Sequence, residues 1–251
     1  MSAPLSKTRP QPGFRESFDQ LKRAQKTRKG APLYLLYVNR PAGRTIAAAL
    51  RFTRVAPNHV TWAGAALTYG TLLWVALWAQ PTPAAALAGV LLAVGYALDS
   101  ADGQLARLQG TSSAYGEWLD HLLDNGRITV MHVAAFCFLA RTTEYDVVLL
   151  ALGCGAFLLA SSVIFFGGIL FDQLAKHSGT GGGPEPVRDD RRLFVRSVVM
   201  LPVDYGVTCL VFLLLPGPVV FLAAYLTLAA AHVLIGAAFV LHWRGKLLRL
   251  R

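Results

Sequence analysis

Charged residues are scarce in this sequence. Asp, Glu, Lys and Arg together make up 15% of the 251 residues, and 54% are hydrophobic, whereas about a quarter of an ordinary soluble domain is charged. This composition excludes a typical water-soluble globular domain and indicates that lipid surrounds much of the chain. The apolar runs do not alternate with polar residues, so they predict membrane helices rather than the strands of a membrane barrel.

Cysteine is rarer still, with three residues in the chain. Cys137, Cys154 and Cys209 lie singly within apolar runs, with no CxxC spacing and no histidine at the spacing that a shared metal would need. The pattern excludes a zinc ribbon and a dithiol redox motif. It predicts that all three cysteines are packing residues.

Long apolar runs, by contrast, are abundant. A helix of about 20 residues crosses a hydrocarbon core of roughly 30 Å. The sequence therefore predicts an all-α integral membrane protein with six transmembrane helices. The six runs cover residues 58–79, 84–108, 114–140, 146–171, 193–215 and 218–241.

An amphipathic segment precedes the first run. Residues 41–54 place Ile46 and Leu50 on one face of a helix and Arg44 and Arg54 elsewhere. This pattern is typical of a helix that lies at the membrane interface. A plain juxtamembrane linker is the alternative.

Positive charge is distributed unevenly along the chain. The formal net charge is +10, and of the 24 Lys and Arg residues twelve precede residue 55, five lie within 176–196 and four follow residue 243. The loops near 80–83 and 216–218 carry none. By the positive-inside rule this distribution puts both termini on the cytoplasmic side of the cell membrane. The charge also favours anionic membrane lipids as partners. The sequence shows no basic segment interleaved with aromatic residues, so it gives no indication of nucleic-acid binding.

The predicted organisation has three parts. Residues 1–38 contain no apolar stretch at their start, so we expect no signal peptide and predict a disordered, basic cytoplasmic tail. Residues 39–243 form the membrane domain, and 244–251 form a basic cytoplasmic C-terminus. The glycine-rich residues 179–186 predict a flexible loop, because no GK[ST] follows them as in a phosphate-binding loop.

Four aspartates interrupt the second and third runs. Asp99 and Asp102 are three residues apart on one predicted helix, and Asp120 and Asp124 are four apart on the next, so each pair shares a helix face. The polar turn at 109–113 makes the two helices antiparallel, which lets the pairs face each other. Four carboxylates at membrane depth need compensation, and hard oxygen ligands suit Mg²⁺ or Mn²⁺. The sequence therefore predicts a site for two divalent cations.

Small and polar residues accompany the aspartates. Gly103 and Gly116 remove side-chain bulk, so a phosphate or a neighbouring helix can approach closely, and Ala106 does likewise. Arg107 can contact a diphosphate, and Ser113 can donate its hydroxyl to it.

Together these residues form one motif. The pattern D-x2-D-G-x2-A-R-x8-G-x3-D-x3-D is matched at all eight fixed positions, and the stretch resembles the signature of the CDP-alcohol phosphotransferase (CDP-alcohol phosphatidyltransferase) family. The fixed positions are Asp99, Asp102, Gly103, Ala106, Arg107, Gly116, Asp120 and Asp124.

Two weaker resemblances flank the motif. Residues 56–61 look like a PNxxT segment that helps to hold CDP in this family, although a Pro-Asn pair alone is typical of a helix start. Residues 187–194 resemble a stretch seen before the fifth helix of some members. With the six-helix layout, the resemblance covers most of the chain from about residue 38.

The resemblance implies specific roles. Asp99, Asp102 and Asp120 would bind metal, with Asp99 and Asp120 bridging two ions, while Asp124 would bind one ion and accept the proton of the acceptor hydroxyl. The active site would face the cytoplasm, and the protein would form a homodimer. The residues implied in binding the CDP donor are Pro57, Asn58, Val60, Thr61, Gly103, Ala106, Arg107, Ser113 and Gly116.

The substrates are less well defined. The leading interpretation is transfer from CDP-diacylglycerol to a phosphorylated polyol such as inositol phosphate or glycerol phosphate, with release of CMP in phospholipid biosynthesis. The alternative donor is a soluble CDP-polyol or CDP-aminoalcohol. Four arginines either bind a phosphate on the acceptor or only set membrane orientation. They are Arg188, Arg191, Arg192 and Arg196.

A transporter is the alternative from another class, because ion- and proton-coupled pathways also use intramembrane aspartates. Clustering of the acids on two helices, without an internal repeat, favours the transferase. Arg127 and His132 are expected to be satisfied by polar neighbours rather than to be catalytic. Glu117, His121 and Arg141 show no distinguishing pattern.

Overall fold

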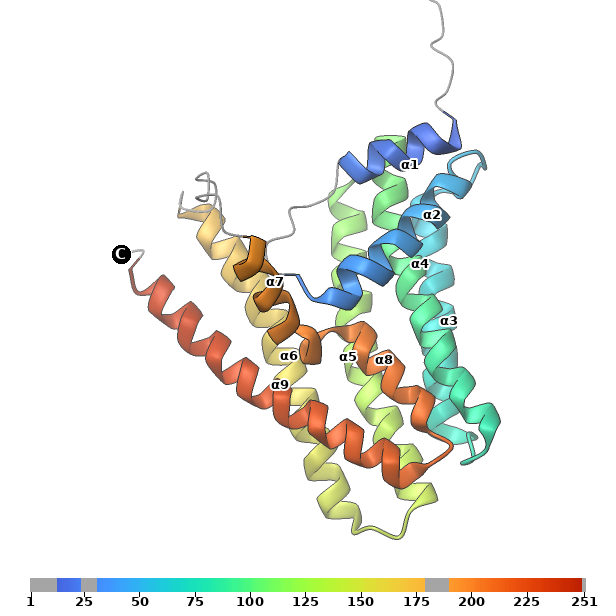
Figure 1. Ribbon diagram of the computed structural model, residues 1–251, viewed down its shortest axis with the longest axis vertical. Coiled ribbons are helices and arrows are strands. Elements are labelled where there is room, and N and C mark those ends of the chain that lie inside the picture. The colour runs from blue at the N-terminus through green and yellow to red at the C-terminus, as the bar shows by residue number, and fades with distance from the viewer. Residues whose placement is uncertain (1–12, 24–30, 179–189, 250–251) are drawn as a thin grey trace, which may run out of the picture.

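The computed structural model describes residues 13–23, 31–178 and 190–249. Over these residues every regular element is helical and there is no strand, as the composition predicts (Figure 1). The elements in chain order are α1 (Phe14–Arg23), η1 (Leu35–Asn39), α2 (Arg40–Leu50), α3 (Pro57–Leu77), η2 (Pro83–Ala86), α4 (Leu87–Gln109), α5 (Ala114–Thr142), α6 (Val147–His177), α7 (Asp190–Val199), η3 (Leu201–Val203), α8 (Tyr205–Val211), η4 (Phe212–Leu214) and α9 (Pro218–Leu247).

Five helical units are long and apolar enough to cross a membrane. They are α3, the joined η2 and α4, α5, α6 and α9. Large apolar side chains cover their outer faces: Leu152 and Leu159 of α6 and Leu234 and Leu241 of α9 are between 65% and 72% exposed. An apolar surface of this extent is expected to contact lipid, and the prediction of an all-α membrane protein is confirmed.

The predicted fifth span, 193–215, is not one continuous helix. It is divided into α7, η3, α8 and η4, of which Tyr205–Leu214 is the shorter apolar part. Pro202 lies in η3, where proline removes a helix hydrogen bond. The Asp204 carboxylate then accepts the backbone N–H groups of Gly206 and Leu35, each at 2.9 Å. The prediction of a continuous helix is wrong here, because averaged hydropathy does not detect a break.

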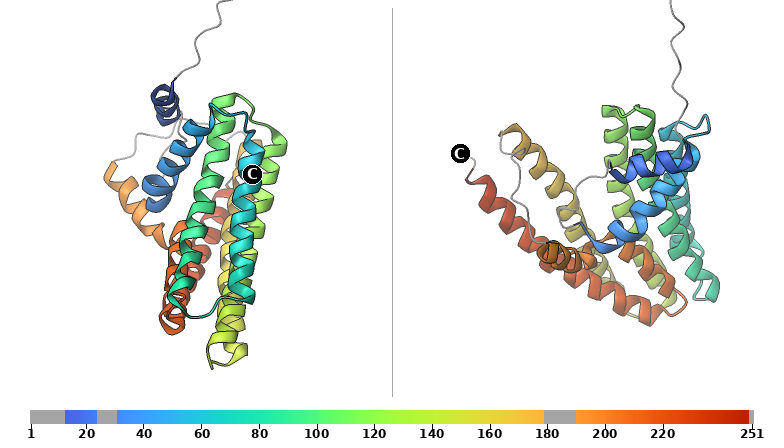
Figure 2. Two further views of the ribbon diagram at one scale, coloured as in Figure 1. Left: turned by 90° about the vertical axis from the view of Figure 1, so that its right-hand side faces the viewer. Right: turned by 45° about the horizontal axis from the view of Figure 1, so that its top comes forward.

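The spanning helices fall into two groups (Figures 1 and 2). α3 packs against both α4 and α5, while α6 packs along α9, and α5 joins the groups through its contact with α6. At the end of the molecule that carries α1 and α2, α6 and α9 lean away from α4. Glycine brings α3 and α4 close together, since a Cβ at Gly95 would lie 2.2 Å from Thr68 Oγ1.

The largest apolar cluster lies at the opposite end of the bundle. Its aromatic side chains include Phe138 and Phe221, which are fully buried and meet edge to face with ring centroids 5.9 Å apart. Cys154 and Cys209 belong to the same cluster, and Cys137 is half-buried. All three cysteines are free thiols, which agrees with the prediction that they are packing residues.

Arg141 closes the end of α3 at this side of the bundle. Its guanidinium donates to the backbone carbonyls of Val75, Ala76 and Ala79 at 2.9 to 3.3 Å. These carbonyls are among those that a helix C-terminus leaves without partners. Arg141 therefore has a structural role.

α1 lies inside the segment for which the sequence predicts disorder. Phe14, Phe18 and Leu21 recur at helical spacing. Leu21 is buried against α2 and α4, and the Arg44 guanidinium lies 4.9 Å from the centre of the Phe18 ring. The prediction of disorder is wrong for residues 14–23, because the low average hydrophobicity of the tail hides a short amphipathic period. Residues 1–12 and 24–30 lie outside the described residues.

The juxtamembrane helix is present as α2 and ends at Leu50, four residues before the predicted end. Its surroundings differ from those of a helix resting on lipid alone, because α2 packs against α4. A Cβ at Gly43 would lie 2.7 Å from Ser100 Oγ. Arg44, which the sequence predicts on the polar face, is only 7% exposed.

Candidate active site

The turn between α4 and α5 creates the site. Gly110 caps the C-terminus of α4, and its φ of 68° lies in the left-handed region that favours glycine. Ser113 caps the N-terminus of α5, because its Oγ accepts the Gly116 N–H at 3.1 Å. Both helices pack on α3. The two predicted aspartate pairs consequently face each other across the space between α4 and α5.

The four aspartates form two overlapping groups. One oxygen each from Asp99, Asp102 and Asp120 lie within 4.8 Å of one another, and so do ligand atoms of Asp120, His121 and Asp124. Asp120 belongs to both groups. These separations would allow three ligands to share one ion, and carboxylate oxygens are the ligands that Mg²⁺ and Mn²⁺ prefer.

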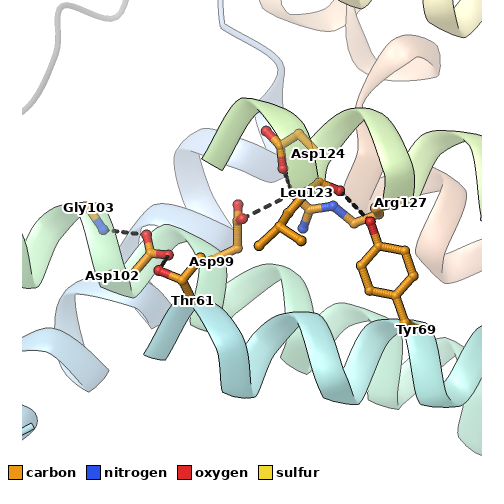
Figure 3. A network of polar contacts seen from close by, with 8 residues as sticks. All are labelled: Thr61, Tyr69, Asp99, Asp102, Gly103, Leu123, Asp124 and Arg127. Atoms are coloured by element: carbon orange, nitrogen blue, oxygen red, sulfur yellow. Dashed lines mark hydrogen bonds and ion pairs between the residues drawn. The ribbon is translucent and has the colours of Figure 1, made fainter. Parts of the chain in front are cut away.

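Asp102 is the most buried of the four, with 6% of its surface exposed. Its Oδ2 accepts the Thr61 hydroxyl at 2.5 Å, and its Oδ1 accepts the backbone N–H of Gly103 (Figure 3). Thr61 comes from the first turns of α3. The PNxxT segment is therefore connected directly to the aspartate motif.

Arg127 links the aspartates of α4 to those of α5 (Figure 3). Its guanidinium donates to Asp99 Oδ1 at 3.0 Å and forms an ion pair with Asp124. The rings of Tyr205 and Tyr96 flank it, with centroids 4.8 and 5.8 Å away. Arg127 is satisfied by polar neighbours as predicted, but spacing alone does not identify those neighbours as the aspartates themselves.

A polar cavity of about 690 Å³ opens beside the first aspartate group. Asp99, Asp102 and Asp120 line it, together with all but one of the residues that the resemblance implicates in donor binding. Those lining residues are Pro57, Asn58, Thr61, Gly103, Ala106, Arg107, Ser113 and Gly116. The exception is Val60, which is buried in the apolar cluster formed with Ala101 and Leu105.

Two helix N-termini border the polar cavity. The start of α3 contributes Ala56, Pro57 and Asn58, and the start of α5 contributes Ser113 and Gly116. Helix N-termini carry partial positive charge and unpaired N–H groups, so they favour anionic groups such as phosphates. The polar cavity thus combines a carboxylate wall with surfaces suited to a diphosphate.

A second, inner cavity of about 290 Å³ is lined in part by Arg127. Of the four aspartates of the motif, only Asp124 lines it. Its lining comes from α4, α5, α6, η3, α8 and α9 and from the segment before α2, and it includes Tyr96, Arg127, His132, Ser161, Asp204, Thr208 and His232. Leu35 lines both cavities.

Two of the four arginines predicted to bind the acceptor are described by the structure, and they are not brought to these cavities. Arg191 and Arg196 are exposed on α7, and neither lines the polar or the inner cavity. Arg188, the side chain of Arg192 and the glycine-rich residues 179–186 lie outside what the structure describes.

The residues of the polar cavity that sequence reasoning did not assign to the site include Glu117 and His121. The buried Nδ1 of His121 has no hydrogen-bond partner among the described residues. Its spacing of three residues before Asp124 places both on one face of α5. That spacing was the available signal, but it is too common on helices to stand out alone.

Comparison with known proteins agrees with the geometry. A family model described as CDP-alcohol phosphatidyltransferase matches residues 54–182, just over half of the chain. The matched segment includes α3, α4, α5 and α6, and with them all four aspartates. No curated protein sequence matches the chain. The match over this length shows that the chain belongs to the CDP-alcohol phosphatidyltransferase family.

Proposed function

We propose that this membrane phosphotransferase binds the CDP part of its donor in the polar cavity and transfers the donor's substituted phosphate to an alcohol with the help of divalent cations. The observation that carries the proposal is the convergence of Asp99, Asp102 and Asp120 to within 4.8 Å on the wall of that cavity. Membership of a phosphotransferase family sets aside the transporter alternative.

The residues present fit two divalent cations. The ligand atoms of both groups are carboxylate oxygens apart from the ring nitrogen of His121, which suits Mg²⁺ or Mn²⁺. Asp99, Asp102, Asp120 and Asp124 would hold the ions. When bound, divalent cations neutralise charge that develops on the diphosphate oxygens during displacement.

The protein's own groups would hold the donor. The N-termini of α3 and α5 border the polar cavity and would stabilise the negative diphosphate. Arg107, whose side chain is exposed at the cavity wall, would contact a phosphate oxygen. Thr61 orients the Asp102 carboxylate through its 2.5 Å hydrogen bond.

Asp124 would act as the general base. In the transfer, the acceptor oxygen bonds to the donor's distal phosphorus, the bond from that phosphorus to the oxygen of CMP breaks, and CMP leaves. The acceptor's proton passes to a carboxylate, which is needed because a neutral hydroxyl is a poor nucleophile. Asp124 is suited to this role because it faces the inner cavity while Arg127 holds its orientation.

We propose CDP-diacylglycerol as the donor and the cytoplasmic face of the cell membrane as the location. α1, α2, the α4–α5 turn and the C-terminal end of α9 lie at one end of the molecule (Figure 1), and most of the Lys and Arg residues belong to these parts and the segments beside them. A clustered positive charge favours the cytoplasmic side. A donor with acyl chains requires its headgroup chemistry to occur at that interface.

The test is CMP release by the full-length protein reconstituted in lipid, with Mg²⁺, CDP-diacylglycerol and a panel of alcohols. We expect release that depends on both metal and acceptor, that stops with EDTA and that returns with added Mg²⁺ or Mn²⁺. Activity in EDTA would contradict the role assigned to the cations. Release of CMP with a CDP-polyol or CDP-aminoalcohol, but not with CDP-diacylglycerol, would show that the donor is a soluble CDP-alcohol. The proposed type of reaction would then be unchanged.

A further inference from the structure

The inner cavity begins at the proposed base and extends into the membrane domain. Asp124 and His132 both line it, and both belong to α5. Eight residues separate them, which corresponds to about 12 Å along a helix. A molecule in this cavity can therefore place one end at Asp124 and the other deep among α5, α6 and α9.

The cavity provides no unused Lys or Arg side chain. Among the described residues that line it, Arg127 is the only Lys or Arg. Its guanidinium is already shared between the carboxylates of Asp99 and Asp124. Burying a phosphate without a cation to pair with it is strongly unfavourable. Away from the cations that Asp124 would hold, the cavity is consequently unsuited to a phosphate group on the ligand.

The far end offers neutral hydrogen-bonding groups. His132 Nδ1 lies 2.6 Å from the Tyr225 hydroxyl, and its Nε2 lies 3.2 Å from Ser161 Oγ. His232 Nδ1 lies 2.9 Å from the Leu228 carbonyl. A carbonyl only accepts, so that nitrogen carries the proton, and Nε2 of this tautomer is an acceptor. Ser161 Oγ and His232 Nε2 can bind a hydroxyl without any charge on the ligand.

The size and walls of the cavity restrict the ligand further. Between the two ends, Ile128, Met131, Ile164 and Phe165 form an apolar wall. The volume of about 290 Å³ lies at the lower end of the usual range for small-molecule sites, which is about 300 to 1,000 Å³. A molecule with two acyl chains does not fit in that space.

From these observations we infer that the inner cavity is the acceptor site and that it takes a small uncharged alcohol with at least one further hydroxyl. One hydroxyl lies at Asp124, and another is bound near His132, Ser161 and His232. The inference rests on the proposed phosphotransfer. It differs from the sequence-based expectation of a phosphorylated acceptor held by the arginines of α7.

The first test compares matched pairs of acceptors in the reconstituted full-length protein. With Mg²⁺ and CDP-diacylglycerol, CMP release is measured with glycerol and myo-inositol and with glycerol 3-phosphate and inositol 1-phosphate. We expect at least one uncharged alcohol to be about tenfold or more better than its phosphate at equal concentration, because the phosphate has no partner.

Every other outcome contradicts either this inference or the proposed function. Preference for a phosphate overturns the inference, and so does metal-dependent binding of the donor without transfer to any member of the panel. Absence of metal-dependent donor binding contradicts the proposed function itself. Donor binding, measured separately by displacement of a radiolabelled CDP-linked donor, distinguishes the two failures.

A second test uses two neighbouring serines of α6. Ser161 lines the inner cavity, whereas Ser162 lines neither cavity. We expect Ser161→Leu to raise the KM for the acceptor by about tenfold or more by filling the cavity, with the donor KM unchanged. Ser162→Leu should leave both values close to those of the native protein. Equal effects of the two substitutions, or a change confined to the donor KM, would contradict the inference.

If the Ser161→Leu protein fails to fold, a pair of threonine-to-valine substitutions, which conserve side-chain shape, tests the same inference. Thr208 lines the inner cavity and is buried, and Thr227 of α9 is exposed away from it. Thr208→Val should raise the acceptor KM about fivefold, the expected cost of one lost hydrogen bond, and Thr227→Val should not. An unchanged acceptor KM in Thr208→Val protein would overturn the placement of the ligand.

Discussion

The polar cavity and the inner cavity differ in the groups that line them, and Arg127 lines the inner cavity while contacting Asp99 of the polar cavity. The polar cavity is bordered by three aspartates, two helix N-termini and Arg107, which suits cations and a diphosphate. The inner cavity has an apolar wall, two histidines, the carboxylates of Asp124 and Asp204, and a single arginine that is already paired. Arg127 contacts one carboxylate from each cavity. In the proposed assignment, the charged donor binds in the polar cavity, the uncharged acceptor binds in the inner cavity, and Asp124 receives the acceptor's proton.

Removing the proposed base is expected to have the largest effect. Asp124→Asn should lower kcat by about 10² to 10⁴-fold, the usual contribution of general acid–base catalysis, while donor affinity stays close to native. The measurements are CMP release and equilibrium donor binding in the same lipid preparation. Asp172→Asn, at an exposed position of α6, is the matched control. Normal turnover in Asp124→Asn protein would rule out the role as base.

Replacing Arg127, which contacts a carboxylate from each cavity, should reduce both the stability of the protein and its turnover. Arg127→Gln removes a buried guanidinium that pairs with the half-buried carboxylates of Asp99 and Asp124, and loss of one partner of a buried ion pair costs up to about 3–5 kcal/mol. Arg127→Lys keeps the charge but not the planar fork that reaches two carboxylates, so its loss should be smaller. Thermal unfolding in detergent and CMP release provide the two readouts.

Arg141→Gln is the matched control for Arg127→Gln. It removes a guanidinium that caps α3 at the far end of the bundle, so it should lower the unfolding temperature while the folded fraction keeps native kcat and KM. If Arg127→Gln behaved in the same way, Arg127 would be structural only and the separation of the cavities would not depend on it.

A substitution in the polar cavity should weaken binding of the donor and leave binding of the acceptor unchanged. Thr61→Val removes the hydroxyl that binds Asp102 at 2.5 Å, and a hydrogen bond to a charged group is worth about 1.5–3 kcal/mol. We expect the donor KM to rise about tenfold or more and the acceptor KM to remain native. Thr71→Val, which removes a hydroxyl bonded only within α3, should change neither. A rise in the acceptor KM would contradict the assignment of the two cavities.

The smallest effect is expected on α7. Arg191 and Arg196 lie outside both cavities, so Arg196→Gln should alter kcat and both KM values by less than about twofold, as is usual for surface substitutions. A rise of the acceptor KM by tenfold would instead restore the sequence-based hypothesis that these arginines bind a phosphate on the acceptor.

Much of the polar cavity was predictable, because its aspartates and the turn between them are close together in the sequence. The spacing of Asp99, Asp102, Asp120 and Asp124 assigns each pair to one helix face, and Gly110 and Ser113 end one helix and start the next. Hydropathy also predicted the five long spanning helices, including α4 and α5, which carry the aspartates. The prediction was wrong at 193–215, where Pro202 and Asp204 break the run, and at 14–23, where a short helix is present.

The inner cavity was not predictable, because its residues are far apart in the chain. Asp124, Ser161, Thr208 and His232 lie on four different helices, and no local spacing relates them. By itself the sequence determined the membrane environment, the helix faces of the aspartates and the family, since each depends on composition or on nearby residues. Only the tertiary structure decided that Arg127 pairs with Asp99 and Asp124 and that a second cavity adjoins Asp124, because helix packing brings distant side chains together.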